Sequence, residues 1–262
     1  MNPQGTIPIS LTGRWCALNC AHCGARYLMH MRGFEEIDKY AQEGIQSFLL
    51  SGGLDVNGKL PFSNAVLRKL RFLKEKYSLQ YNFHVGFPDK PLTELKEVAD
   101  VVSFDFFSDT KIMRKIYGIE VEGSRMIEVM KSMGIFCVPH VTIGVDCGRI
   151  THEYRSIEML SEYFTSVVLN IFVPTFGTFY ESCKPPTIGQ VKDLFEYAKK
   201  LFKIVTLGCM QPKGSYRSAL QNELEGIADV IVKPVRRVVN DFDGCCALLL
   251  KQISQEVGSN VR

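Results

Sequence analysis

The sequence lacks the long apolar run that a membrane-spanning helix requires. No stretch approaches the roughly 20 apolar residues needed to cross a bilayer. Met1–Ser10 does not combine a basic segment with an apolar one, as a secretion signal does. Charge of one sign is also scarce: the 262 residues carry a formal net charge of +3, with no basic tract interleaved with aromatic side chains. We therefore expect a cytoplasmic protein that binds neither membrane nor nucleic acid.

Features that divide a chain into parts are absent as well. We find no linker, no low-complexity tract and no repeat with a period of roughly 20 to 50 residues. Hydrophobic residues make up 46% of the chain, which is ample material for one large core. The sequence therefore predicts a single domain over residues 1–262, with a C-terminal tail that starts at about residue 235.

Short apolar segments alternate with amphipathic segments along the whole chain. The predicted strands are Thr6–Leu11, Ser47–Ser51, Tyr81–Gly86, Val101–Phe106, Phe136–Val145, Val167–Val173, Ile204–Leu207 and Val230–Lys233. The predicted helices are Phe34–Glu43, Ser63–Lys76, Pro91–Ala99, Gly123–Met133, Glu153–Tyr163, Ile188–Leu201 and Tyr216–Gly226. Strands that alternate with helices of this length build a parallel sheet. We expect an α/β fold with a closed TIM-type (β/α)8 barrel, and an open six-stranded partial barrel is the alternative.

One face of several predicted strands carries polar side chains. Successive residues of a strand point to opposite faces, so the apolar face would meet the outer helices and the polar face would line the barrel. The polar set is His84, Asp105, His140, Thr142, Asn170 and Thr206. Polar groups inside a barrel cost free energy unless something bonds them, so the pattern favours a polar ligand site. Hydrogen-bonded core residues are the alternative, particularly at His140.

The cysteines give the strongest local signal. There are nine, and an odd number in a reducing compartment argues against a disulfide framework and for metal or redox chemistry. Cys16, Cys20 and Cys23 lie just after the first predicted strand. Thiolates are the ligands that iron–sulfur clusters need, and three of them leave one iron of a cubane open. A structural zinc site takes four protein ligands, and a simple dithiol pair leaves Cys16 unexplained.

This Cys-x3-Cys-x2-Cys loop resembles the signature of radical S-adenosylmethionine (SAM) enzymes, with a redox-active 4Fe–4S cluster on Cys16, Cys20 and Cys23. The resemblance implies that the open iron binds SAM, which is reductively cleaved to a 5′-deoxyadenosyl radical. It also implies SAM contacts at the ends of successive strands. The residues implied are Ser51, Gly52 and Gly53 for the amino group, Asp105 for the ribose, Thr142 beside the adenine, and Asn170 in a biotin synthase-like loop.

The chain most resembles the biotin synthase-like group, and within it the archaeal-type homologues that carry a Gly-Cys-Met-x-Pro-x-Gly stretch, here at Gly208–Gly214. Within that group it resembles the components of the archaeal-type two-protein lipoyl synthase. The resemblance implies sulfur insertion into a protein-bound octanoyl chain. It further implies an octanoylated lipoyl-carrier protein or peptide as substrate, a homologous radical SAM partner protein, and an electron donor such as ferredoxin. Single-chain lipoyl synthases carry an N-terminal cysteine triplet, and this chain has no cysteine before Cys16.

Sulfur insertion in that group draws on an auxiliary iron–sulfur cluster. We expect Cys209, Cys245 and Cys246 to be its ligands, with the C-terminal tail folded back across the mouth of the barrel. Cys183 is held in reserve as a ligand, Cys147 lies in a loop on the same side, and Cys137 is expected in the core. Incidental buried thiols are the alternative for all of these.

Carboxylate binding is a further hypothesis, for Arg217, Arg236 and Arg237. Two other functions remain open: a single-cluster radical SAM enzyme for carbon-skeleton rearrangement or cofactor assembly, and a non-catalytic iron–sulfur or zinc scaffold.

Overall fold

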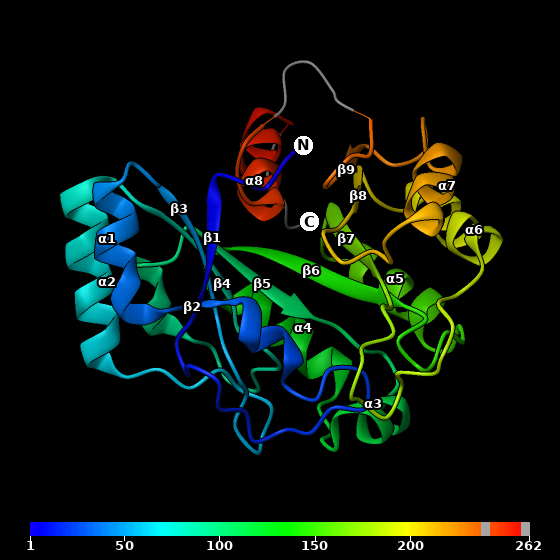
Figure 1. Cartoon of the computed structure of the whole chain (residues 1–262), viewed down its shortest axis with the longest axis horizontal. Helices are drawn as coiled ribbons and strands as arrows, with labels where there is room; N and C mark the ends of the chain where they lie inside the picture. Colours follow the sequence, from blue (N-terminus) through cyan, green and yellow to red (C-terminus); the bar gives the residue numbers. More distant parts are fainter. Residues whose placement is uncertain (237–241, 258–262) are drawn as a thin grey trace.

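A computed structural model describes residues 1–236 and 242–257, and shows a curved parallel sheet with most of its helices on the outer side (Figure 1). The strand order is β2-β1-β3-β4-β5-β6-β7-β8-β9. The strands are β1 (Thr6–Ser10), β2 (Arg32–Gly33), β3 (Ser47–Ser51), β4 (Gln80–His84), β5 (Val101–Asp105), β6 (Phe136–Ile143), β7 (Ser166–Ile171), β8 (Ile204–Leu207) and β9 (Val230–Ile231). Every neighbouring pair is parallel, as the alternation of strands and helices predicts.

The helices follow the predicted segments with three differences. The α-helices are α1 (Ile37–Gln42), α2 (Asn64–Tyr77), α3 (Thr110–Tyr117), α4 (Gly123–Ser132), α5 (Glu153–Ser161), α6 (Ile188–Lys199), α7 (Ser215–Glu223) and α8 (Cys246–Val257), and the 3-10 helices are η1 (Arg26–His30), η2 (Phe34–Glu36) and η3 (Thr93–Glu97). The helix predicted at Pro91–Ala99 is only the 3-10 turn η3, and neither α3 nor α8 was predicted. No helix in the described part of the chain is long and apolar enough to cross a membrane.

The outer layer shows why the amphipathic segments fold as helices. In α2, Leu67, Leu70 and Leu73 recur at a spacing of three and are buried in the main core. The Ser63 hydroxyl accepts a hydrogen bond from the Val66 amide and caps the first turn. Ser78 adopts a left-handed conformation and ends the helix.

The inner face of the sheet carries the polar set, as predicted. Register places Asp105 beside His140, and Thr142 beside Asn170. The alternate residues, such as Phe104 and Val141, are fully buried in the core that packs against the helices. The alternation of residues along the strands therefore gives the sheet an apolar outer face, which packs against the helices, and an inner face that carries the polar set.

The expected closure of the barrel is wrong, because the two edge strands do not pair within the described residues. The short strand β2 occupies the free edge of β1, beside Ile9 and Ser10. On the other edge, the amino group of Met1 donates to the Ile231 carbonyl at 2.9 Å, and the Lys233 amide donates to the Met1 carbonyl at 3.1 Å. The N-terminus thus bridges to β9, and the sheet is an open partial barrel of nine strands rather than six.

The C-terminal helix closes the end of the sheet opposite the long loops (Figure 1). Ala247, Leu248 and Leu250 of α8 pack in one apolar cluster with Val101 and Ile204, the first residues of β5 and β8. The expectation that the tail folds across the mouth is therefore wrong. Burying the apolar face of α8 against the floor of the barrel removes it from water, which the exposed mouth would not do.

Candidate functional site

A tight turn brings the cysteines of the first loop together. The Cys20 carbonyl accepts hydrogen bonds from the Cys23 amide at 3.1 Å and the Gly24 amide at 2.9 Å. Gly24 and Ala25 both have positive φ, which reverses the chain directly after Cys23. Cys20 is buried, while Cys16 and Cys23 are half-buried, and all three follow β1 at the mouth of the sheet.

The thiols interact electrostatically with one another. Burial, and then the neighbouring Cys23 and Cys16, raise the pKa of Cys20 to about 12. Burial also raises the pKa of Cys23. Such groups are neutral thiols without a metal, and lose their protons when a cation binds them.

The loop offers three thiols as metal ligands. Among residues 1–236 and 242–257, the three sulfur atoms do not form a group compact enough to surround one ion. A cubane spreads its thiolates, because each binds a different iron. Three thiols in one loop are the ligand set that the predicted cluster needs.

The loop after β3 lies directly against the cysteine loop. The Leu54 amide donates to the Cys16 sulfur at 3.4 Å. The Thr12 hydroxyl accepts from the Gly53 amide at 2.7 Å and donates to the Trp15 carbonyl at 3.0 Å. A Cβ atom on Gly53 would lie 1.8 Å from the Trp15 oxygen, so only glycine allows this approach. Gly53 thus packs against Cys16, and Gly52 packs beside Thr12.

The neighbouring polar residues of this loop are already engaged. The Asp55 carboxylate accepts from the amides of Asn57 at 2.8 Å and Lys59 at 2.9 Å, which caps a turn. The Ser51 hydroxyl donates to the His84 carbonyl at 3.2 Å. Backbone groups of the two glycines are therefore the ones left to meet a ligand there.

Asp105 ends β5 close to the cysteine loop. Burial is the main cause of the raised pKa values of Cys20 and of the Tyr117 phenol, and the charge of Asp105 adds to both shifts. Burial raises the pKa of Asp105 itself, and His84 opposes that shift. The carboxylate thus faces both the thiol loop and the barrel interior.

Asn170 contacts the Gly208–Gly214 segment that follows β8. Its side-chain oxygen accepts from the Met210 amide at 3.3 Å, and a Cβ on Gly208 would lie only 2.1 Å from that oxygen. Thr142 is its register neighbour on β6. The Gly208–Gly214 stretch therefore reaches the same layer as the predicted SAM residues.

Two of the three predicted auxiliary ligands, Cys245 and Cys246, lie at the floor of the barrel. The Asn82 amide donates to the Cys245 sulfur at 3.2 Å, and Cys245 and Cys246 are both buried. Hydrogen bonds from Cys246 and from Asn82 lower the pKa of Cys245, while the pKa of Cys246 is raised. Cys209 is an exposed residue, yet its thiol is close enough for Cys245 to raise its pKa. These three thiols do not form a single-ion group in the described parts of the chain.

The remaining cysteines have structural roles. Cys147 and Cys183 form a disulfide between the loops after β6 and β7, with a Cα–Cα distance of 5.2 Å. The expectation that the chain has no disulfide is therefore wrong, and Cys183 is not a free reserve ligand. Cys137 is buried in the core as expected, where burial raises its pKa to about 12.

The arginines predicted to bind a carboxylate are engaged within the protein. Arg217 donates to the Gln211 carbonyl at 2.9 Å, and Arg236 pairs with Glu225 at 3.5 Å. Arg237 lies outside the described residues.

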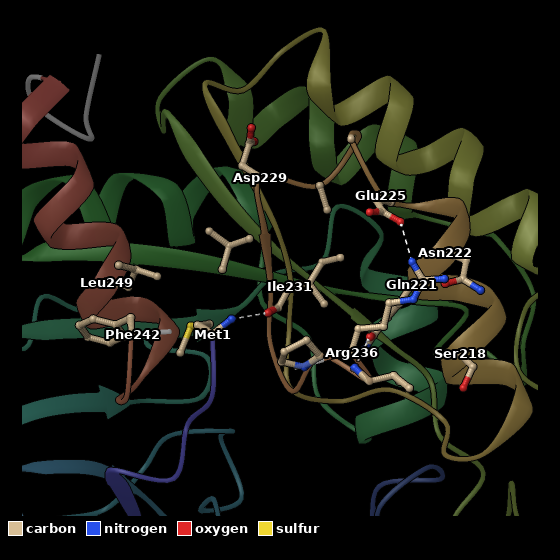
Figure 2. A pocket seen from close by; sticks show the side chains of 15 residues that line it. Met1, Ser218, Gln221, Asn222, Glu225, Asp229, Ile231, Arg236, Phe242 and Leu249 are labelled. Carbon is tan, nitrogen blue, oxygen red and sulfur yellow. Dashed lines mark hydrogen bonds and ion pairs between the residues drawn. The ribbon is translucent and has the colours of Figure 1, made fainter. Parts of the chain in front are cut away.

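Two cavities flank the sheet at different places. One of about 630 Å³ adjoins the cysteine loop at Ala17 and Ala21 and reaches Tyr117 and Tyr180. Another, of about 590 Å³, lies at the open seam between α7, β9 and α8, where Met1 is tied to Ile231 (Figure 2). The seam cavity contains none of the cluster cysteines. Proximity to the thiols therefore favours the first as an approach to the site.

Comparisons with known proteins address the fold. No protein-family model and no curated protein matches the sequence. Among solved structures, methylornithine synthase (PylB) superposes with a TM-score of 0.60 at 14% identity, covering 98% of this chain and 83% of that one. The chain shares that fold.

Two further solved structures superpose less well. The radical SAM methyltransferase TsrM from Kitasatospora setae, with cobalamin and a 4Fe–4S cluster bound, has a TM-score of 0.41 at 15% identity, covering 62% of this chain and 36% of that one. The carboxyl transferase domain of Rhizobium etli pyruvate carboxylase with pyruvate has a TM-score of 0.45 at 10% identity, covering 97% of this chain and 43% of that one. Superpositions this weak carry no argument, and the function rests on the site.

Proposed function

We propose that the protein is a radical SAM enzyme. The observation that carries this proposal is the loop of Cys16, Cys20 and Cys23 at the mouth of a parallel partial barrel, with Gly53 packed against Cys16. When bound, a 4Fe–4S cluster with one open iron supplies an electron and a binding position for SAM.

The chain's own residues would hold and orient the nucleotide. Backbone groups of Gly52 and Gly53 lie beside the thiols and face the SAM amino group. The Asp105 carboxylate accepts hydrogen bonds from the two ribose hydroxyls. Thr142 and Asn170 lie on the next strands, where they border the adenine and the sugar.

The test is anaerobic reconstitution followed by iron counting and SAM cleavage. The wild-type chain should bind about four irons at this loop and release 5′-deoxyadenosine with a reductant. Alanine at Cys16, Cys20 or Cys23 should abolish both while leaving the circular dichroism spectrum unchanged. The matched control is Cys137→Ala, which removes a buried thiol far from the loop and should retain both. Wild-type 5′-deoxyadenosine release by any of the three loop variants would refute the proposal.

The finer proposal is sulfur insertion by a component of a two-protein lipoyl synthase. It is supported by a second group of thiols, with Cys245 and Cys246 in the apolar cluster at the floor of the barrel and Cys209 after the carboxyl end of β8. The lowered pKa of Cys245 favours the thiolate that binds iron. A substrate held between the two thiol groups could lose hydrogen to one cofactor and gain sulfur from the other.

Sulfur insertion has its own experiment. The substrate is an octanoyl-lysine peptide, representing an octanoylated carrier protein, tested with and without a homologous radical SAM protein and with ferredoxin as electron donor. The Cys245→Ala/Cys246→Ala variant should lose one cluster's iron, from about eight to about four, and form no carbon–sulfur bond. It should still release 5′-deoxyadenosine. Full iron content with sulfur delivery intact would overturn the finer proposal alone.

A single-cluster radical SAM enzyme is the second candidate, for carbon-skeleton rearrangement or cofactor assembly. One observation favours it: Cys245 and Cys246 belong to an apolar cluster with Val101, Val138 and Ile204, as incidental buried thiols do. About four irons in the wild-type chain, with SAM cleavage intact, would select this candidate.

A further inference from the structure

Three side chains that the proposed cluster does not use as ligands converge inside the barrel. His84 ends β4, Asp105 ends β5 and His140 lies in β6, so they come from three adjacent strands. One ligand atom from each lies within 4.8 Å of the other two. The His84 Nε2 atom is 3.8 Å from an Asp105 carboxylate oxygen, and the two imidazole rings have centroids 5.2 Å apart.

The hydrogen-bonding capacity of these three side chains is not met by the protein. The His140 Nε2 atom is buried and has no hydrogen-bond partner. At 3.8 Å, His84 and Asp105 are too far apart for a direct hydrogen bond. A half-buried carboxylate and a buried imidazole nitrogen with no hydrogen-bond partner together leave an unmet demand for a cation.

We propose that His84, Asp105 and His140 bind one divalent transition-metal ion inside the barrel. Imidazole nitrogen and carboxylate oxygen suit iron, cobalt, manganese and zinc. Two histidines and one carboxylate leave further coordination positions open. The bound ion would hold a heteroatom of a substrate in the polar layer beneath the cysteine loop.

Ion entry is compatible with the exposure of the group. The side chains of His84 and Asp105 are 22% and 27% exposed, so they line solvent-accessible space. Asp105 is proposed to bind both the ion and the ribose of SAM, whereas His84 and His140 are proposed to bind only the ion. Substitutions at the histidines therefore test the ion without testing the proposed SAM chemistry.

The experiment measures Co²⁺ binding to the full chain with alanine at Cys16, Cys20, Cys23, Cys209, Cys245 and Cys246, which removes the thiols of both proposed cluster sites. One equivalent should bind, with visible d–d bands and no thiolate charge-transfer band. His84→Gln and His140→Gln should each weaken binding by more than about a hundredfold, because even outer-sphere partners of metal ligands are worth about 10–100-fold. The matched control is His152→Gln, which removes a buried imidazole that stacks on Phe107 instead.

A second measurement does not depend on the folding of the cysteine-to-alanine variant. Mn²⁺ is bound poorly by thiols, so the loss of its free paramagnetic resonance signal reports binding to the otherwise wild-type, cluster-loaded chain. His140→Gln should abolish that loss and leave the iron content unchanged. Equal affinity of His140→Gln and His152→Gln for either ion, a thiolate band in the Co²⁺ spectrum, or no bound ion would overturn the metal site. Failure of cluster assembly in the wild-type chain would instead overturn the proposed function.

Discussion

Gly53→Ala tests the close approach of the two loops that build the mouth. Gly53 has no left-handed backbone, so the substitution adds only one methyl group to an accessible conformation. That methyl would lie 1.8 Å from the Trp15 oxygen and 2.6 Å from the Cys16 Cα, whereas real Cβ contacts are essentially never under 3.0 Å. The loops must therefore separate by about 1.2 Å, the difference between 3.0 and 1.8 Å.

Both neighbours are backbone atoms, so no side chain can rotate away. Overpacking of this kind costs about 1–3 kcal/mol, which lowers the melting temperature of a chain of this size by roughly 2–12 °C. A displacement of about 1 Å near a reacting centre costs about a hundredfold in rate. We expect iron content close to wild type, because all three thiols remain, and 5′-deoxyadenosine formation reduced by about a hundredfold.

The assay is single-turnover release of 5′-deoxyadenosine at saturating reductant, with iron content and melting temperature measured on the same preparation. Gly189→Ala is the matched control, because nothing lies within 4 Å of its added Cβ and it lies in α6. It should leave the rate unchanged and stabilise the fold by about 0.5–1 kcal/mol. A wild-type rate for Gly53→Ala would refute the argument that the packing of these loops positions SAM.

Three further predictions follow from particular contacts. Asp105→Asn should weaken SAM binding by about ten- to a hundredfold in equilibrium dialysis, because charge-assisted hydrogen bonds are worth about 1.5–3 kcal/mol; an unchanged dissociation constant would show that Asp105 does not bind the ribose. Burial lowers the pKa of His152 from 6.5 to about 4. Between those values the unfolded chain takes up a proton that the folded chain refuses, so stability is lost as the pH falls through that window, by about 3 kcal/mol for this group. His152→Gln should flatten the dependence of urea-unfolding free energy on pH over that range, and an unchanged slope would contradict the assignment. Replacing Cys147 and Cys183 together by serine should lower stability by about 2–4 kcal/mol under oxidising conditions and leave it unchanged in reductant, since the bridge closes a loop with a sequence separation of 36; no difference in oxidising buffer would mean that the bridge does not form.

Local patterns in the sequence were sufficient for the strands and for the inner face of the sheet. All eight predicted strands are present, because short apolar segments separated by amphipathic ones are typical of a parallel sheet, and several of them alternate apolar and polar residues. The same alternation put Asp105, His140 and Asn170 on one face before any pairing was known. The spacing of Cys16, Cys20 and Cys23 likewise put three candidate ligands in one loop after the first strand.

The predictions were wrong for segments whose secondary structure depends on contacts with distant parts of the chain. The run after Cys246 was treated as a tail, because its apolar side chains have no partner nearby in the sequence; its helix is buried only by the first residues of β5 and β8. The opposite error was made at Pro91–Ala99, where the sequence predicted a helix and the structure has only the short 3-10 helix η3. Propensity is a weak prior that tertiary packing overrides.

The sequence by itself determined the parallel α/β architecture, the polar lining of the sheet and the cysteine loop, because periodicity and short spacings act within a few residues. Only the tertiary structure decided which distant residues meet. It left the sheet open at β9, paired Cys147 with Cys183, and sent Cys245 to the barrel floor. It also brought His84 and His140 around Asp105, because strand register is set by burial across the whole sheet and by no local signal.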